Sequence, residues 1–422
     1  MIDPTSSYTL GSSLRTRTAA ETLAIAGPIA ARLGITRVTD ITRLDRVGIP
    51  VAASIRPDAH PLSLCVCAGK GLTAEDALVG AAMEAIEFAL AEPGRSRVEV
   101  MTTKPIRIAD GLSQTLLDLC PRFGVRIDLD AEMVCAAAEE LNSGETWLLP
   151  ADLIFHPGPT ANGNTAYYQA STNGLASGNT VLEATVHGLA EVIERDIQSF
   201  QHFLNTSVLV QSQSLPDFLK PWLKAIADVG LDLYVRYVEN EFGLPFFSST
   251  VVDAQAGTPL YVNGGFGVHT HRSISLVRAI TEAIQSRLSF IHGGRDSMTH
   301  DYRAYRGWSA QRLADRVSEL TAIVANPIGA VNFDDIPDHA AMTPDVESAY
   351  VFLSEALGRC GMTRICRTAF TTPEDVLQVV RIVVPGLEMW DDRSRRVGPR
   401  LRDYVEKLQS DSLRGSDSLR AA

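Results

Sequence analysis

The chain has 422 residues, of which 45% are hydrophobic and 21% are charged, and its formal net charge is −12. This hydrophobic content is sufficient for the core of one large domain or of two closely packed domains. The acidic balance argues against a general nucleic-acid binder, because such binding requires a basic surface.

The first 40 residues are predicted to form an N-terminal helical segment. Residues 18–33 are rich in alanine, which favours a helix, and Gly27-Pro28 is expected to break or kink it. The chain begins without a secretory signal pattern, and it has no apolar run long enough to span a bilayer. We therefore expect a cytoplasmic protein with no membrane partner, in which the six cysteines are reduced thiols.

Residues 41–405 are predicted to form one domain in which strands and helices alternate. The expected strands lie within 45–57, 98–101, 146–150, 231–238, 246–252, 260–262 and 379–384. The expected helices include 112–123, 215–229 and 346–360, with a loop at 155–168 and charged helix and loop at 303–331. This order indicates a layered α/β or α+β fold. Residues 406–422 contain Ser-Asp-Ser-Leu-Arg twice and are expected to be a disordered polar tail.

The most informative stretch runs from Ala170 to Asp196. Small residues precede a helix that begins near Val181, and Thr180 with Glu183 is predicted to form a capping box. At about 100° per residue, the apolar residues of this helix share one face. The opposite face carries Glu183, His187, Glu191, Glu194 and Arg195. On an isolated helix such a face is usually only solvated.

What changes this interpretation is that the pattern occurs three times. Each copy has a glycine-containing loop, then a helix, and late in that helix a Glu-x-Ile-Glu or Glu-x-Ile-Gln step. The three steps are Glu84–Glu87, Glu191–Glu194 and Glu282–Gln285. Positions three apart share a helix face, so each step presents paired oxygen ligands. Five Glu side chains and one Gln can converge only if cations are present. Mg²⁺ is a suitable cation, because it prefers a few carboxylates together with phosphates.

Phosphate also accounts for the glycines and the basic residues. Backbone N–H groups at a helix start attract anions. The basic residues in or beside the three segments are Lys70, Arg195, Arg278, Arg287 and Arg295. Neither a Gly-x-x-x-x-Gly-Lys-Ser/Thr loop nor a Gly-x-Gly-x-x-Gly fingerprint after a strand is present, so a nucleotide site must be of another kind.

Taken together, the motifs resemble those of the YcaO family, ATP-dependent enzymes that activate backbone amides in peptides and some proteins. The resembling segments are Gly69–Gly71, Glu84–Glu87, Ser171–Ala176, Glu191–Asp196, Arg278–Arg287, Gly294–Asp296 and Val384–Glu388. The resemblance runs from about residue 46 to residue 400 and implies a YcaO-type fold with three acidic helices around one nucleotide site. It also implies ATP and Mg²⁺ as cofactors, a precursor peptide or protein as substrate, and a homodimer.

The resemblance also assigns site residues. The implied metal-binding carboxylates are Glu84, Glu87, Glu191 and Glu194. The residues matched to the nucleotide or its metals are Lys70, Asn179, Glu183, Arg195, Arg278, Glu282, Gln285 and Arg287. Lys70 equally fits a lysine that covers a helix end, and Arg56 fits either a family arginine or a solvated charge at a strand end. No catalytic residue is assigned.

Two features depart from the family pattern. Phe88 stands where relatives commonly have arginine, so one phosphate or substrate contact is missing or supplied elsewhere. The last residues lack the proline-rich segment common in azoline-forming relatives, which favours the thioamide-forming type that often works with a TfuA partner. Two alternatives stay open: an azoline-forming cyclodehydratase, and a non-catalytic scaffold subunit that binds nucleotide or peptide.

Overall fold

A computed structural model gives the structure of the chain. It describes residues 8–11, 13–103, 113–128, 131–159, 166–294, 298–392 and 394–420. Arg295 and Asp296, and parts of the expected helix 112–123 and loop 155–168, lie outside these residues. Every strand pair named below is antiparallel, so the fold is mixed α/β with antiparallel sheets.

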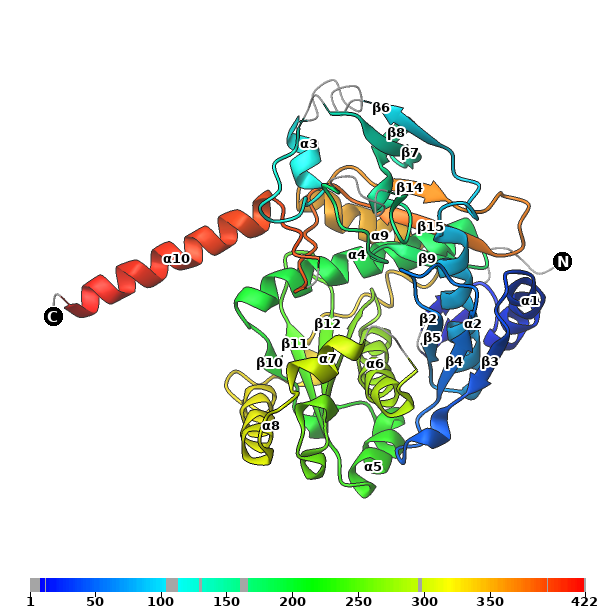
Figure 1. The fold of residues 1–422 in the computed structure, drawn as a ribbon. Coiled ribbons are helices and arrows are strands. Elements are labelled where there is room, and N and C mark those ends of the chain that lie inside the picture. Colours follow the sequence, from blue (N-terminus) through cyan, green and yellow to red (C-terminus); the bar gives the residue numbers. More distant parts are fainter. Residues whose placement is uncertain are drawn as a thin grey trace.

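Three strand–helix units form the centre of the molecule (Figure 1). They are β5 (Val66–Lys70) with α2 (Ala74–Ala91), β9 (Leu175–Gly178) with α4 (Val181–Phe203), and β13 (Val262–Val268) with α6 (Arg272–His292). Each helix packs on its own strand and also contacts the strand of another unit: α2 contacts β9, α4 contacts β13, and α6 contacts β5. The three units therefore close into a ring, as the repeated sequence pattern predicts.

Glycines in the strands allow this close packing. A Cβ atom on Gly69 would lie 2.0 Å from the backbone oxygen of Ala77, and one on Gly265 would lie 2.2 Å from the backbone nitrogen of Ala283. A side chain at either position would push the helix off its strand. The prediction that these glycines form phosphate-binding loops is wrong for Gly69 and Gly265, because both belong to strands.

Each unit contributes its strand to a different sheet. Strand β5 pairs with β4 (Val51–Ile55), which pairs with β3 (Arg37–Asp40), and α1 (Ala19–Arg32) packs against α2. Strand β13 belongs to the sheet β10 (Val208–Leu209), β11 (Asp232–Val238), β12 (Phe246–Val252), β13. Helix α6 covers β12 and β13, while α5 (Lys220–Asp228) and α8 (Ala310–Val324) contact β11.

Strand β9 is the edge of a six-stranded sheet. Its order is β6 (Val100–Thr103), β7 (Met133–Glu140), β14 (Cys366–Ala369), β15 (Gln378–Val383), β9, and β8 (Thr146–Pro150) pairs with β7. Helix α4 packs on β9 and β15 and is covered by α9 (Val346–Arg359). Two further helices, α3 (Ser113–Asp118) and α7 (Thr299–Ala304), are short.

The N-terminal segment differs from the prediction. Strands β1 (Tyr8–Leu10) and β2 (Ser13–Arg15) form a hairpin ahead of α1, where only helix was expected. Helix α1 continues through Pro28 without a break. Thr18 and Glu21 form a capping box at its start, and Leu33 is its C-cap.

The C-terminal segment also differs. Instead of a disordered tail from 406, helix α10 runs over Pro399–Arg420 and projects away from the body of the molecule (Figure 1). Its first turn is anchored, because the backbone nitrogen of Leu401 donates to the buried carboxylate of Glu388 at 2.9 Å. Its remaining residues mix strong helix formers such as Leu, Arg and Glu with Ser, Asp and one Gly, whose helix propensity is lower.

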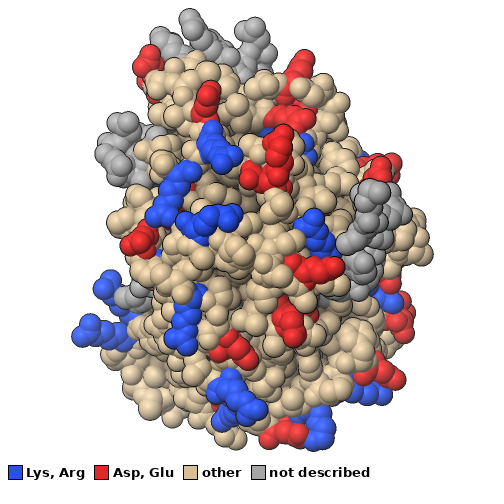
Figure 2. Space-filling view, turned by 90° about the vertical axis from the view of Figure 1, so that its right-hand side faces the viewer, with Lys and Arg blue, Asp and Glu red and all other residues tan. Residues whose placement is uncertain are grey.

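The surface carries charges of both signs (Figure 2), and no disulfide bond joins any of the six cysteines. Acidic and basic side chains are interspersed over the face shown in Figure 2, and the described residues there form no continuous basic stripe. Within the described residues, none of the helices has the length and apolarity needed to cross a membrane.

Candidate active site

The three central helices surround one cavity of about 580 Å³, which is within the usual range for small-molecule sites. Its lining includes seven acidic side chains: Asp76, Glu84, Glu87, Glu183, Glu191, Glu194 and Glu282. It also includes five basic ones: Arg15, Arg17, Lys70, Arg195 and Arg278. The expectation that the acidic helices converge is confirmed, and of the predicted site residues only Arg287 is absent from the lining.

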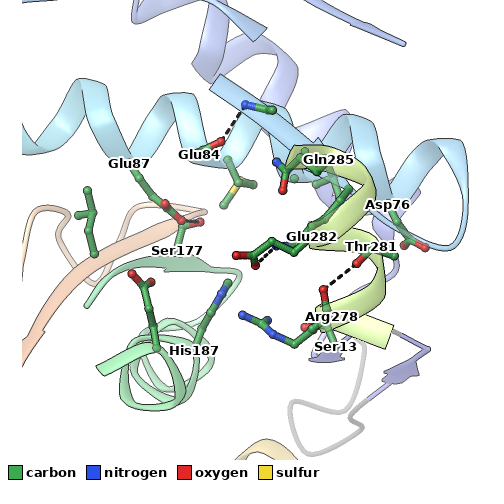
Figure 3. A pocket seen from close by; sticks show the side chains of 18 of the residues that line it. Ser13, Asp76, Glu84, Glu87, Ser177, His187, Arg278, Thr281, Glu282 and Gln285 are labelled. Carbon is green, nitrogen blue, oxygen red and sulfur yellow. Dashed lines mark hydrogen bonds and ion pairs between the residues drawn. The ribbon is translucent and has the colours of Figure 1, made fainter. Parts of the chain in front are cut away.

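Helix α2 contributes the first carboxylate pair. Glu84 accepts a hydrogen bond from the backbone nitrogen of Ala68 at 2.8 Å. Glu87 accepts one from Ser177 Oγ of β9 at 2.5 Å. Figure 3 shows Glu87 of α2 and Ser177 of β9 next to each other, where both line the cavity. These contacts hold the two carboxylates beside the strands that flank the cavity.

The second unit places Glu183 differently from the prediction. Thr180 caps α4 by accepting from the Glu183 backbone nitrogen, but the Glu183 side chain does not complete a capping box. It accepts from Arg15 Nη1 at 3.0 Å, from the Thr16 backbone nitrogen at 2.9 Å, and from Asn179 Nδ2 at 3.1 Å. Glu183 is therefore buried and joins the N-terminal segment to the cavity wall.

Farther along α4, the remaining acidic residues face the cavity with fewer partners. Glu191 makes no hydrogen bond to the part of the chain that is described, and Glu194 accepts only a 3.3 Å bond from Gln198. Arg195 donates to Gln198 at 2.8 Å and lies 3.8 Å from Glu194. The face that a single helix would expose to solvent thus lines the cavity.

The third unit supplies one partner of an ion pair and two further polar side chains. Lys70 of β5 lies 2.5 Å from Glu282 of α6, so the lysine faces the cavity and does not cover a helix end. Arg278 and Gln285 line the cavity one turn to either side of Glu282. In Figure 3, Glu282 and Arg278 point toward the space bounded by α2 and α4.

The assignment of Arg287 to the nucleotide is wrong. Arg287 is buried away from the cavity, where its Nε lies 2.9 Å from Asp45 and its Nη2 lies 3.1 Å from Asp253. It is nine positions from Arg278, which at about 100° per residue places it on the opposite face of α6. Arg287 therefore ties α6 to the loops behind it.

Phe88 and Arg56 form a buried cluster beside the cavity. The Phe88 ring lines the cavity, packs edge-on against His156 at 5.3 Å, and lies 5.8 Å from the Arg56 guanidinium. Arg56 makes a buried 3.0 Å ion pair with Glu92, so the alternative of a solvated charge is wrong. Arg56 does not line the cavity and does not replace a charge at position 88.

Burial changes the acidity of the carboxyl groups. Desolvation raises the pKa of Glu87 to about 8 and that of Glu191 to about 7, with the neighbouring carboxylates adding to the effect. Burial also raises the pKa of Glu194. Burial opposes ionisation of Glu282 as well, but Lys70 and Arg195 outweigh it and lower its pKa. Additional cations in the cavity would therefore be strongly favourable.

The donor set fits Mg²⁺ that arrives with phosphate. Within the described residues, no three His, Cys, Asp or Glu side chains form a preassembled metal site. Mg²⁺ keeps several waters and takes one or two carboxylates together with substrate phosphates. Glu84, Glu87, Glu191 and Glu194 supply such carboxylates from two facing helices, while Lys70, Arg195 and Arg278 supply positive charge for phosphates.

Several residues of the site were not predicted. Arg15 and Thr16 come from the N-terminal segment, which has no counterpart in the repeated pattern. Ser177 lies just after a recognised motif, and nothing in its spacing indicates the bond to Glu87. His187 was visible on the acidic face, at four positions from both Glu183 and Glu191, and that spacing was the available signal.

Comparison with known proteins identifies the class. Residues 68–388 match the model of a family described as YcaO cyclodehydratases that bind ATP and Mg²⁺. The chain is 32% identical to an uncharacterized protein of Methanothermobacter thermautotrophicus, over 91% of this chain and 98% of that one. The chain belongs to the YcaO family.

Two further relatives are informative. The chain is 31% identical, over 89% of each chain, to an uncharacterized protein in the tfuA 3′ region of Rhizobium leguminosarum bv. trifolii. The fold of the present chain resembles that of YcaO from Methanopyrus kandleri bound with AMPPCP and Mg²⁺. The TM-score is 0.71, with 24% identity over 94% of this chain and 98% of that one. That likeness shows the fold. Membership of the YcaO family makes the chain an ATP- and Mg²⁺-dependent enzyme of the type that modifies backbone amides.

The buried carboxyls make stability without ligands depend on pH. A carboxyl whose pKa is raised on folding binds more protons in the folded state, so the free energy of unfolding falls as pH rises from about 4.5 to about 8 for Glu87. Glu87→Gln stays neutral and lacks this decline. We expect its melting temperature, measured without Mg²⁺ and nucleotide, to exceed that of the wild type at pH 8 and to match it near pH 5.

The matched control is Glu75→Gln, an exposed residue in the first turn of the same helix. It should keep the pH dependence of the wild type. The same decline in Glu87→Gln as in the wild type would show that Glu87 is not a buried, protonated group.

Proposed function

We propose that this protein phosphorylates a peptide backbone amide oxygen with ATP and then replaces that oxygen with sulfur, so that a thioamide forms. The observation that carries the proposal is the convergence of acidic residues from three helices with Lys70, Arg195 and Arg278 on one cavity. Phosphoryl transfer depends on positioning and on neutralising charge, and it needs little covalent help from the protein. This lining supplies both.

Each part of the lining has a proposed role. Glu84, Glu87, Glu191 and Glu194 bind Mg²⁺, and Lys70, Arg195 and Arg278 stabilise the phosphate oxygens. Asn179 contacts the nucleotide or its metal, and Glu282 keeps Lys70 in place through their ion pair. Gln285 acts as a hydrogen-bonding residue. Glu183 acts through the N-terminal segment that it holds.

The proposed reaction follows from the poor leaving ability of an amide oxygen. ATP supplies the phosphoryl group that turns this oxygen into part of a phosphate leaving group, with release of ADP. Sulfide then attacks the same carbon, loses its proton, and displaces phosphate, which carries away the original oxygen. The products are the thioamide, ADP and phosphate. The role of the protein is to hold the reacting groups in line and to exclude water.

The preference for sulfur rests on the gene context of a relative. The Rhizobium protein, 31% identical to this chain, lies in a tfuA 3′ region. A TfuA-like protein is therefore the proposed partner, and a precursor peptide or protein is the proposed substrate. An azoline-forming reaction would use the same cavity, with a Cys, Ser or Thr side chain of the substrate as nucleophile, and the product distinguishes the two.

Glu191→Gln should abolish ATP turnover and leave the fold intact. Glu191 makes no hydrogen bond to a described residue, so its carboxylate is available for Mg²⁺ and does not support the core. We expect the rate of ADP release with peptide to fall about a hundredfold or more. Thermal unfolding of both proteins checks the fold.

Glu355→Gln on the exposed side of α9 is the control for that substitution and should keep the full rate. Normal ADP release by the Glu191 variant would return α4 to a purely structural role. No ATP turnover by the wild type with peptide, sulfide and a TfuA-like protein would favour the scaffold alternative.

The product identifies the nucleophile. With ATP, Mg²⁺, sulfide and a substrate peptide, we expect the peptide to gain the mass of a replacement of oxygen by sulfur. An oxygen isotope placed in the target amide should appear in the released phosphate. Mass spectrometry measures both, and loss of one water from the peptide would instead identify an azoline product.

We also propose a homodimer, on the basis of family membership. Light scattering at micromolar concentration should give twice the 45.7 kDa mass of the chain. A monomer mass under those conditions would contradict it.

A further inference from the structure

One titratable side chain in the cavity has no part in the proposed function. His187 lies one turn after Glu183 and one turn before Glu191 on α4, and it lines the cavity with them. Figure 3 shows its ring pointing from α4 into the cavity, toward the space that Glu282 and Arg278 also face. The position is therefore inside the site and not in the core.

The contact with Arg15 determines the tautomer of His187. Arg15 Nη2 lies 3.1 Å from His187 Nδ1. A guanidinium only donates hydrogen bonds and stays protonated, so Nδ1 must accept, and the proton of the neutral ring is on Nε2. Nε2 makes no hydrogen bond within the described chain, and it is not among the occluded polar atoms. The ring thus offers one N–H donor to a ligand in the cavity.

The charges around His187 select the kind of acceptor. Burial lowers the pKa of His187 well below its usual value, and Arg15, Arg278 and Lys70 lower it further. The ring is therefore neutral at neutral pH. Arg15 and Lys70 are paired with Glu183 and Glu282, whereas Arg278 has no ion pair within the described residues. An oxygen that sits near Arg278 and the N–H donor is favoured when it carries negative charge. The anion that the proposed function brings into this cavity is the triphosphate of ATP.

We propose that His187 is a nucleotide-contacting residue. Its neutral ring, held as the Nε2–H tautomer by Arg15, donates a hydrogen bond to a phosphate oxygen of ATP. This inference rests on the proposed function, since it requires the nucleotide to occupy this cavity. A neutral donor orients the phosphate and adds no charge to the cations already present. Arg15 is then a positioning residue that acts through the ring.

Two variants separate the N–H donor from the bulk of the ring. His187→Gln keeps an N–H donor on a side chain of similar reach, whereas His187→Leu keeps only bulk. We expect His187→Leu to weaken the Kd for Mg²⁺-AMPPCP, measured by calorimetry, about tenfold or more, and His187→Gln to stay within about threefold of the wild type. Thermal unfolding checks that both variants fold. His202→Leu, in the last turn of the same helix, is the matched control and should bind as the wild type does.

Nitrogen NMR of histidine-labelled protein gives a second readout that a structural role would not affect. The His187 signals, assigned by their loss in His187→Gln, should report the Nε2–H tautomer from about pH 6 to pH 8. Adding Mg²⁺-AMPPCP should shift the Nε2 signal. A ring protonated on Nδ1, or no shift at Nε2, would overturn the proposal.

The binding results also distinguish this inference from the function on which it rests. If the wild type binds Mg²⁺-AMPPCP and His187→Leu binds it equally well, His187 is not a contact and the proposed function stands. Equal losses in the Gln and Leu variants would overturn the inference too, because the donor would then not be what matters. If the wild type does not bind the analogue, both proposals fall.

Discussion

The burial of several carboxylates around one cavity is the constraint on which the rest of this structure depends. Isolated buried charges are expensive, and proteins reduce that expense with opposite charges, hydrogen bonds or protonation. All three occur here: Lys70 pairs with Glu282, Arg15 and Asn179 bind Glu183, and burial raises the pKa of Glu87 to about 8. The remaining imbalance is what makes the cavity receptive to Mg²⁺ bound to phosphate.

The fold makes this arrangement possible by bringing helices unusually close to strands. Gly69, Gly265 and Gly267 leave no room for a Cβ, so the helices that carry the acidic steps lie directly on their strands. Each helix also contacts the strand of another unit. The apolar faces of α2, α4 and α6 are therefore buried against strands and neighbouring elements. The acidic faces of the three helices line the cavity. The distances between their carboxylates are set by the packing of helices on strands and not by loops.

The N-terminal segment completes the site from outside the repeated units. Leu14 is buried in the core that contains α4, and the next residues bind Glu183 and His187. One short extended stretch therefore has two effects. It neutralises a buried carboxylate that would otherwise be unpaired, and it fixes the orientation of a ring that faces the cavity. The Glu-x-Ile-Glu steps alone do not form this wall.

The sequence by itself determined the family and the three acidic helices, and of its twelve predicted site residues only Arg287 does not line the cavity. This was possible because helical periodicity is local and a threefold pattern indicates a shared purpose. Periodicity also indicates that Arg287 cannot share the cavity face with Arg278, because nine positions separate them and place them on opposite faces of α6. Only the tertiary structure decided that Gly69 and Gly265 lie in strands, that Arg15 reaches Glu183 across 168 positions, and that Ser177 binds Glu87. These contacts join segments distant in the chain, and no local propensity encodes which segments will meet.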